Sequence, residues 1–436
     1  MIIQLRNFKN IFLVPDLRKK ICVSLGIFAV YRFGAHIPVP GIDQVKLVGF
    51  ISQAASGIMG YLNLISGGAL TRFSIFALGI GPYISASIMM QILTVVIPTL
   101  EQLQKEGEYG RKIINQYTRY LTLGLSVIQG LGLAVLAESN GLALNPGWGF
   151  RLTSILIFSV GSLFVMWLGE QITTYGIGNG SSMIIFVGIV AGLPEGLAKI
   201  INNIRLGQFE PLLGLLLLAI TIAIVTCIIF LEKGERKIPV QYAKRVVGNK
   251  IYGGQSSYIP LKINSANVIP VIFAGSTLAM PMMLVKFLSV KFPTLNFLAE
   301  WFVPRGPVYM VLMVGLIVFF TFFYTAIIIN PEELAENMRK SGGFVPGIRP
   351  GRKTADFFNY VLTRVSFPGA LYLAALAILP DILSIIFNFP AMFSGTGLLI
   401  VVGVALDTSA QIESQLIERR YEGFLSTGRL SGRYRR

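Results

Sequence analysis

The sequence predicts an all-α polytopic membrane protein with ten transmembrane helices, and three observations support this prediction. Of the 436 residues, 53% are hydrophobic and only 13% are charged, so the apolar surface exceeds what a soluble core can bury. Ten apolar runs have about the length of 20 residues that crosses a bilayer. Lys and Arg residues collect in alternate connections between these runs, as they do in proteins that cross a membrane several times.

The first run follows a basic segment that resembles the n-region of a signal peptide. The GAHIPVPG sequence after this run offers no A-x-A cleavage site, so we expect a retained first helix. The ten runs lie at residues 21–37, 74–97, 119–137, 152–170, 181–200, 212–231, 266–285, 308–329, 361–380 and 393–413.

The distribution of basic residues predicts the orientation of the chain. Of the 37 Lys and Arg residues, 27 lie in the N-terminal segment and in the connections after the second, fourth, sixth, eighth and tenth runs, and only seven lie on the opposite side. Because basic loops stay on the cytoplasmic side, both termini are expected there. The formal charge of +16 is then explained mostly by topology.

The second run is interrupted at its front end, in the stretch SGGALTRFSIFALGIGPYISASIMMQILTVVIP at residues 66–98. A plain membrane anchor needs neither Gly67 and Gly68 nor Arg72 at this place. Irregular backbone and charge at membrane depth are tolerated only where they face protein or a water-filled cavity. We therefore expect this stretch to line a pathway, although Arg72 could instead reach the external interface.

Two features flank this interruption. Ile80, Ile84 and Ile88 are spaced four residues apart, which predicts one aliphatic helix face. Spacing alone favours ordinary packing or lipid contact, but an apolar constriction also closes a pore by excluding water. Residues 57–68, GIMGYLNLISGG, are too short to span. They are expected to form either an interfacial loop or a short re-entrant helix that moves.

The ten runs divide into two halves of five. The broken second run has a counterpart in the seventh, at residues 264–284, which Pro270, Gly275 and Pro281 interrupt. Interrupted spans at corresponding positions point to a pathway between inverted repeats, although packing kinks give the same pattern. The expected divisions are a cytoplasmic N-terminal segment at 1–20, an N-terminal half at 21–205, a C-terminal half at 206–416 and a basic cytoplasmic tail at 417–436.

Two cytoplasmic connections, 232–265 and 331–358, are longer than adjacent helices require, which is typical of functional loops. In the first, Gly248-Asn249 predicts a two-residue β-hairpin turn. In the second, Asn330 and the PEE that follows predict a short capped helix, expected to stop at Gly342-Gly343. The FVPGIRPG sequence would then hold Arg349 on an exposed tip. Topology alone explains the charge of these loops, while ribosomal RNA or an acidic protein would also suit such a surface.

The sequence offers no constellation for catalysis or for binding a cofactor. His36 is the only histidine, which excludes a two-histidine metal site and a Ser-His pair, and no GxxxxGK[ST] phosphate loop is present. Glu170 and Asp407 are isolated, so we expect packing features rather than a proton relay. We therefore expect no enzyme activity, metal or cofactor. A secondary transporter is the alternative, because it also uses inverted repeats, whereas an intramembrane protease is disfavoured by the lack of paired aspartates.

Seven motifs spread over nearly the whole chain are specific when taken together. They are IPVPGID at 37–43, SGGALTRFSIFALGIGPYISASIMMQIL at 66–93, INQYTRY at 114–120, MWLGEQIT at 166–173, GIGNGSSMIIFVGIVAGLP at 176–194, IPVQYAKR at 238–245 and FVPGIRPG at 344–351. With them the chain resembles SecY, the pore subunit of the bacterial and plastid Sec protein-conducting channel. The resemblance implies a clamshell of two inverted five-helix halves, with an hourglass pore and a lateral gate toward lipid, that passes unfolded secretory proteins and releases transmembrane segments.

The same resemblance implies roles for individual residues. Residues 57–68 would form the plug, and Ser181 stands at a pore-ring position where an aliphatic residue is usual, so the ring is expected to be five-membered or slightly polar. The implied sets are the plug and hinge Gly57, Tyr61, Leu64, Gly67, Gly68 and Arg72; the pore ring Ile80, Ile84, Ile185, Ile272 and Ile400; the lateral gate Ser85, Gln129 and Asn264; and the docking residues Lys244, Arg245 and Arg349.

The resemblance further implies partners and a location. The expected partners are small membrane subunits similar to SecE and SecG, the SecA motor, the ribosome, preproteins with signal sequences, and membrane lipid, without a small-molecule substrate. The expected location is the bacterial plasma membrane or the plastid thylakoid membrane, with cytoplasmic or stromal termini.

Overall fold

The computed structural model describes residues 14–43, 46–47, 63, 66–207, 211–242, 245–247, 250–252, 256–291, 306–386 and 395–427. The chain divides into two units. The first holds residues 1–55, 62–192 and 404–436, and the second holds residues 56–61 and 193–403. The two halves expected from the sequence, which meet at residue 205, stay a prediction.

A helix lies at each of the ten predicted runs, and seven of the described helices are long and apolar enough to cross a membrane. Helix α5 (Gly81–Val96) and helix α6 (Pro98–Lys105) make an eighth span if they count as one, because a 99° bend separates them. Two further helices are not among these spans. Helix α2 (Pro15–Gly34) begins with charged turns, and helix α11 (Ile269–Lys291) has a shorter apolar part, Ile269–Ala279. The ten positions are confirmed, whereas membrane-crossing length is confirmed for seven or eight.

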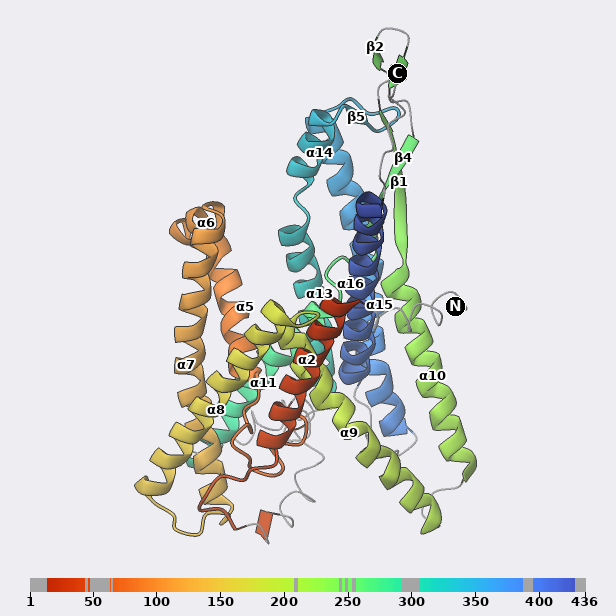
Figure 1. Cartoon of the computed structure of the whole chain (residues 1–436). Coiled ribbons are helices and arrows are strands. Elements are labelled where there is room, and N and C mark those ends of the chain that lie inside the picture. Colours follow the sequence, from red (N-terminus) through yellow and green to blue (C-terminus); the bar gives the residue numbers. More distant parts are fainter. Residues whose placement is uncertain are drawn as a thin grey trace. The chain divides into compact units, whose positions relative to one another are not determined.

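In the first unit, helices α7 (Glu108–Ser139) and α8 (Trp148–Tyr175) lie side by side (Figure 1), with α5 against α7 and α2 against α8. Ion pairs join α7 to α8 near both ends: Arg119 Nη2 lies 2.8 Å from Glu170 Oε2, and Arg151 Nη2 lies 2.6 Å from Glu138 Oε2. Glu170, which we expected to be isolated, therefore has a basic partner and fastens two helices together.

The first unit is completed by parts of two further helices. It contains α9 (Gly180–Arg205) up to Gly192 and α16 (Gly395–Thr427) from Val404 onward. The backbone N–H of Gly178 donates to Gln411 Oε1 at 3.0 Å, which joins the turn after α8 to α16.

The second unit combines helices with a small antiparallel sheet in the strand order β4-β1-β5. Helix α13 packs against α11 and α15, and α14 packs against α15. Ile238 and Val240 of β1 alternate inward and form one apolar core with Met338 of α14 and Phe358 of α15. The elements are α10 (Pro211–Lys233), β1 (Glu235–Tyr242), β2 (Arg245–Val247), β3 (Lys250–Tyr252), β4 (Ser256–Lys262), α11 (Ile269–Lys291), α13 (Pro307–Ile328), α14 (Pro331–Lys340), β5 (Gly343–Phe344) and α15 (Arg352–Ile386).

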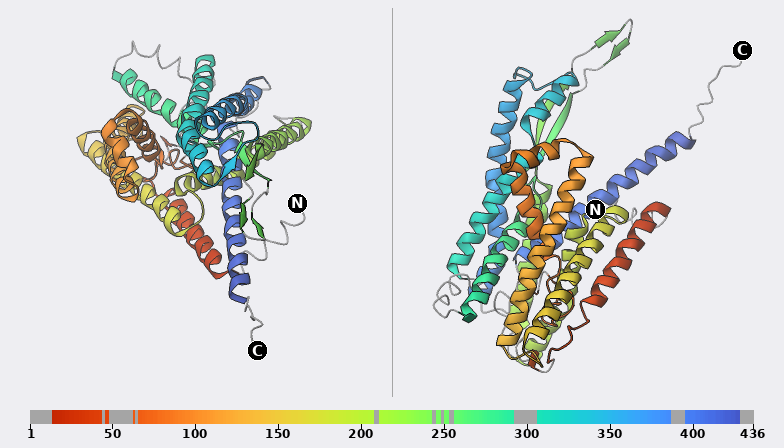
Figure 2. Two further views of the ribbon diagram at one scale, coloured as in Figure 1. Left: turned by 90° about the horizontal axis from the view of Figure 1, so that it is seen from above. Right: turned by 90° about the vertical axis from the view of Figure 1, so that its left-hand side faces the viewer.

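The predicted hairpin is present. Strands β2 and β3 are antiparallel with Val247 opposite Lys250, so two residues connect them, and Figure 2 shows the pair extending past β1 and β4. The turn residues Gly248 and Asn249 themselves lie outside the described residues.

Candidate functional site

The interrupted stretch predicted to line a pathway is irregular over a longer distance than expected. Residues 66–80 form turns, and helix α5 begins only at Gly81, with Pro82 in its first turn. Phe73 has a φ of 45° and Gly79 a φ of 54°. Ile80 is the N-cap of α5, and its carbonyl oxygen accepts the Ile84 N–H at 3.1 Å. The predicted series of Ile80, Ile84 and Ile88 therefore begins at the cap rather than inside the helix, and all three side chains are buried.

Tertiary packing on α8 explains why the helix starts late. A Cβ built at Gly161 would lie 2.0 Å from the carbonyl oxygen of Ile75, so only glycine lets this backbone approach α8. Ser162 Oγ donates to the carbonyl oxygen of Gly79 at 3.3 Å. On the other side, the Val39 N–H donates to Phe73 O at 2.9 Å. These contacts satisfy backbone groups of the irregular segment that a helix would have paired internally.

Helix α2 holds the hinge, which we define as residues 66–68. The Tyr31 hydroxyl donates to Ser66 O at 3.1 Å, and Arg32 Nη1 donates to Gly67 O at 2.6 Å. The sequence did not lead us to predict that Tyr31 and Arg32 contact the hinge. The charge of Arg32 inside the first apolar run was the signal that could have indicated such a contact. A charged side chain at membrane depth needs polar partners, and the hinge carbonyl supplies one.

The two hinge glycines differ in their surroundings. Both have left-handed backbone, with a φ of 65° at Gly67 and 85° at Gly68. A Cβ built at Gly67 would lie 2.6 Å from Gly188 Cα on α9, whereas a Cβ at Gly68 would meet nothing within 4 Å. Gly67 is therefore needed for contact as well as for conformation.

The plug predicted at 57–68 lies mostly outside the described residues, and so do Gly57, Tyr61 and Leu64. Asn63 and the hinge are described. The Gly68 N–H donates to Asn63 O at 2.9 Å, and the Thr71 N–H donates to Asn63 Oδ1 at 3.0 Å. Asn63, the first described plug position, is therefore bound to the hinge and to the turn that follows it.

The five predicted ring isoleucines are all buried, at 1% to 6% exposure. In the first unit, Ile80 lies close to Gly169 of α8. A Cβ built at Gly169 would lie 3.5 Å from Ile80 Cδ1. The hydroxyl of Ser181, in the first turn of α9, forms a hydrogen bond to a neighbouring residue: its Oγ donates at 2.6 Å to Asn179 Oδ1, just before the helix begins. The ring members of the first unit are Ile80, Ile84 and Ile185, and those of the second are Ile272 and Ile400.

The three predicted gate residues have different environments. Ser85 on α5 is buried and Gln129 on α7 is half-buried. Asn264 is 1% exposed, and its Nδ2 donates to Glu232 Oε1 at 2.8 Å and to Asn267 O at 2.9 Å. Asn264 thus joins the end of α10 to the turn that leads into α11.

The docking loops take the predicted local structure. Asn330 caps α14 by accepting the Glu332 N–H at 3.0 Å, and Ser341 and Gly342 follow its last turn. Arg349 beyond it is exposed, as predicted, and its carbonyl accepts the Thr354 hydroxyl at 2.9 Å. Arg245 lies in β2, whereas Lys244 lies outside the described residues.

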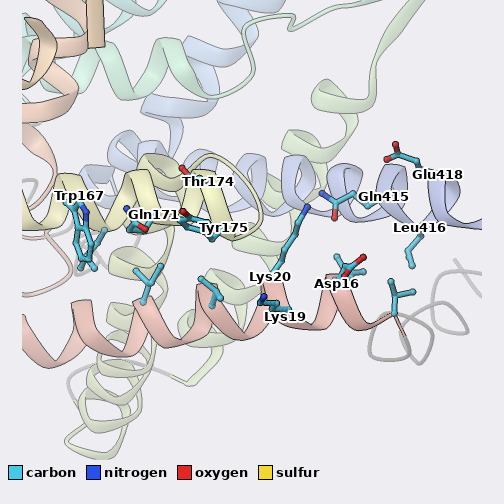
Figure 3. A pocket seen from close by; sticks show the side chains of 15 residues that line it. Asp16, Lys19, Lys20, Trp167, Gln171, Thr174, Tyr175, Gln415, Leu416 and Glu418 are labelled. Carbon is cyan, nitrogen blue, oxygen red and sulfur yellow. The ribbon is translucent and has the colours of Figure 1, made fainter. Parts of the chain in front are cut away.

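A groove of about 820 Å³ lies in the first unit between α2, α8 and α16 (Figure 3). Lys20 extends from α2 toward Gln415, while Trp167 points from α8 toward α2. Amines beside aromatic and aliphatic side chains are typical of a membrane–water interface. The lining residues are Val14, Asp16, Leu17, Lys19, Lys20, Val23, Ile27, Trp167, Leu168, Gln171, Thr174, Tyr175, Gln415, Leu416 and Glu418.

Comparisons with known proteins identify the family. The SecY family pattern matches residues 74–409. The protein translocase subunit SecY of Aquifex aeolicus is 45% identical over 96% of this chain and 98% of its own length. The chain belongs to the SecY family. The resemblance seen in the sequence is thereby confirmed, and this member of the SecY family is a multi-pass integral membrane protein.

Solved structures agree with the SecY fold. A structure described as that of a protein conducting channel has a TM-score of 0.68 at 17% identity and covers 95% of each chain. Sec61 in the canine ribosome-channel complex has a TM-score of 0.63 over the same coverage, also at 17% identity. The predicted polytopic helical fold, with its small hairpin, is therefore the fold of this family.

Proposed function

We propose that this chain is the central protein-conducting channel of a Sec translocase. It would pass unfolded secretory proteins across the membrane and release transmembrane segments into lipid through a lateral gate. The observation that carries the proposal is the irregular segment 66–80, which leads from the hinge into buried Ile80 and Ile84. The names of the relative and of the solved structures, a translocase subunit and a protein conducting channel, support it.

The chemistry of these residues suits a passive channel. Aliphatic side chains make no fixed hydrogen bonds, so a ring of five isoleucines would fit around any unfolded chain without selecting its sequence. Residues 57–68 would form the plug, and a signal sequence would part the gate and shift the plug. The energy for transport comes from a partner, because this chain supplies no nucleotide-binding motif. We assign it no catalytic reaction.

Polar substitutions in the ring test this assignment. Ile84→Asn and Ile272→Asn are each expected to raise ion leakage from proteoliposomes about tenfold. An aliphatic constriction excludes water, whereas a polar constriction stays hydrated and lets ions pass. Tolerance of defective signal sequences is expected to rise with it. The control is Ile317→Asn in α13, which is equally buried and should lower thermal stability without leakage. Unchanged leakage in both ring variants would disprove the ring.

The alternative of a secondary transporter is not supported. The relative named above is a translocase subunit, and the solved structures with this fold are protein-conducting channels. Arg72 is the one ionisable residue of the broken segment before α5; the part that leads into the helix contributes Ile80 and glycines rather than the ionisable groups that coordinate a small solute. Uptake of a small solute by the purified chain alone would be needed to restore this alternative.

We also propose that the loops of the second unit dock the translation and motor partners, with Lys244, Arg245 and Arg349 as contacts. The Sec61 structure named above is part of a ribosome-channel complex, which supports a ribosome partner. SecA and small subunits similar to SecE and SecG complete the proposed assembly. The proposed location is a bacterial plasma or plastid thylakoid membrane, with both termini cytoplasmic or stromal, as the basic loops favour.

Reversing the charge at the loop tip tests the docking role. Arg349→Glu is expected to weaken ribosome or SecA binding about tenfold, which corresponds to about 1.4 kcal/mol, because like charges across an interface repel. The matched control is Arg352→Glu, which makes the same charge change on the exposed first turn of α15. Co-sedimentation with ribosomes measures the difference. Equal losses in both variants would indicate a general effect of charge rather than a contact at the tip.

A further inference from the structure

Two neighbouring side chains in the last turn of α2 bind the hinge, and their bonds are not equivalent. The carbonyl oxygen of Ser66 accepts the Tyr31 hydroxyl at 3.1 Å and also the Ala69 N–H at 3.3 Å. The carbonyl oxygen of Gly67 accepts Arg32 Nη1 at 2.6 Å, and no second donor to it occurs among the described residues. Loss of the Tyr31 hydroxyl would therefore leave Ser66 O paired, whereas loss of the Arg32 guanidinium would leave Gly67 O unpaired.

The bond from Arg32 is also the one that can open and close. Tyr31 is 1% exposed, and its ring stacks on Phe76 at 6.0 Å between centroids with 8° between the planes, so it is a fixed part of the core. A hydrogen bond from a guanidinium is about twice as strong as a neutral one. Arg32 is only half-buried, so opening its bond does not leave a fully buried charge. The contact between Arg32 and Gly67 is therefore strong but reversible.

The surroundings of Gly67 leave its peptide little freedom. A Cβ built at Gly67 would lie 2.6 Å from Gly188 Cα on α9 and 3.2 Å from Arg32 Nη1 on α2, so the hinge passes between these two helices. Just beyond the hinge, Arg72 is hydrogen-bonded to the ring of His36, which follows α2. Within this passage the bond from Arg32 fixes the direction of the Gly67 carbonyl, which a buried backbone needs as a partner.

The hinge packs against the end of the irregular segment, where the predicted pore ring begins. The backbone N–H groups of residues 68–71 donate to Asn63 or to Ser66. A Cβ built at Gly79 would lie 3.5 Å from Ser66 Cα, and Gly79 directly precedes Ile80. A change in the hinge backbone therefore reaches the residue beside the ring without passing through the rest of the segment.

We propose that Arg32 is a positioning residue for channel opening: its bond to Gly67 O holds the hinge in the closed arrangement and must break before the hinge moves. Tyr31 supplies packing that stays in place, whereas Arg32 sets how readily the hinge opens. A signal sequence has to offset the loss of this bond, and a weaker bond lets a defective signal sequence open the channel. This inference deepens the proposed channel function and rests on it.

The first test measures hydrogen exchange of the amides of residues 68–71 in the purified protein and needs no transport assay. Arg32→Met removes the donor and is expected to speed this exchange about tenfold. Arg32→Gln, a neutral donor, should give an intermediate rate, and Arg32→Lys, a charged donor, should restore most of the protection. The control Tyr31→Phe should change the rate less than about twofold, because Ser66 O keeps the Ala69 N–H. Unchanged exchange in Arg32→Met, or in Arg32→Gln if the first variant does not fold, would overturn the proposal.

The second test measures ion leakage of proteoliposomes and transport of a preprotein with a defective signal sequence. Arg32→Met is expected to raise both about fivefold, and Arg32→Lys should stay near the unmodified protein. The matched control is Arg151→Met, which removes another half-buried arginine of the first unit and leaves Glu138 unpaired; it should lower the melting temperature without leakage. Equal leakage in the two Met variants would overturn the proposal. Failure of the unmodified protein to transport an intact preprotein would instead count against the channel function and leave the exchange result in place.

Discussion

Gly67→Ala is expected to destabilise the protein by about 3 kcal/mol and to make the closed channel leak. About 1 to 2 kcal/mol of this comes from placing a Cβ on left-handed backbone, where Gly67 has a φ of 65°. The remainder comes from overpacking, because the new Cβ would lie 2.6 Å from the backbone of Gly188. Backbone atoms cannot rotate away, so α9 or the hinge has to move. The apparent melting temperature in detergent and leakage of liposomes measure the two effects.

Gly68→Ala is the matched control for this prediction. Its φ of 85° imposes a similar conformational cost, but nothing lies within 4 Å of its Cβ. We expect a loss of about 1 kcal/mol and little leakage. If both variants lose the same stability, contact between the hinge and α9 contributes nothing, and only the backbone conformation matters at this glycine pair.

Local features were predictable from the sequence, and features made by distant contacts were not. The helices follow from apolar runs, and the β2–β3 hairpin follows from the two turn residues that its register requires. The cap at Asn330 was likewise predictable, since its acceptor and donors lie within three residues. Each of these depends on the covalent neighbourhood alone.

The late start of α5 depends instead on contacts across more than 80 residues. Its apolar sequence is compatible with a helix from Ser74, but Gly161 admits the Ile75 carbonyl and Ser162 binds that of Gly79. The clamp of α2 on the hinge has the same character, because Arg32 and Gly67 are 35 residues apart. No periodicity in either segment encodes such a pairing, so the structure was needed to find the residues that hold the hinge.

Removing the buried amide of Asn264 is the second change expected to have a large effect. Asn264 and Glu232 are 1% and 8% exposed, and 2.8 Å separates Asn264 Nδ2 from Glu232 Oε1. Asn264→Leu withdraws a donor from a buried carboxylate, and Glu232→Leu withdraws an acceptor from a buried amide. We expect each to lower stability by about 2 to 3 kcal/mol. Chemical or thermal unfolding in detergent measures the loss.

A double-mutant cycle distinguishes the interaction between Glu232 and Asn264 from a general loss of stability. Glu232→Leu with Asn264→Leu should cost clearly less than the sum of the single changes, because the double variant leaves neither partner buried alone. Glu235→Gln is the control: this carboxylate keeps 39% of its side chain exposed and pairs with Lys237 at 3.3 Å, so a change within about 0.5 kcal/mol is expected. Strict additivity would show that the two side chains are not coupled.

The cycle also bears on the gate. If Asn264 acted only by closing a seam between gate helices, its replacement would change leakage and signal-sequence selection without depending on residue 232. The hydrogen bond to Glu232, together with that to Asn267 O, instead fixes the turn from which α11 starts. Coupling between positions 232 and 264 in leakage as well as in stability would therefore show that the end of α10 sets the position of α11. Asn264 would then act on the gate by fixing the turn that precedes α11.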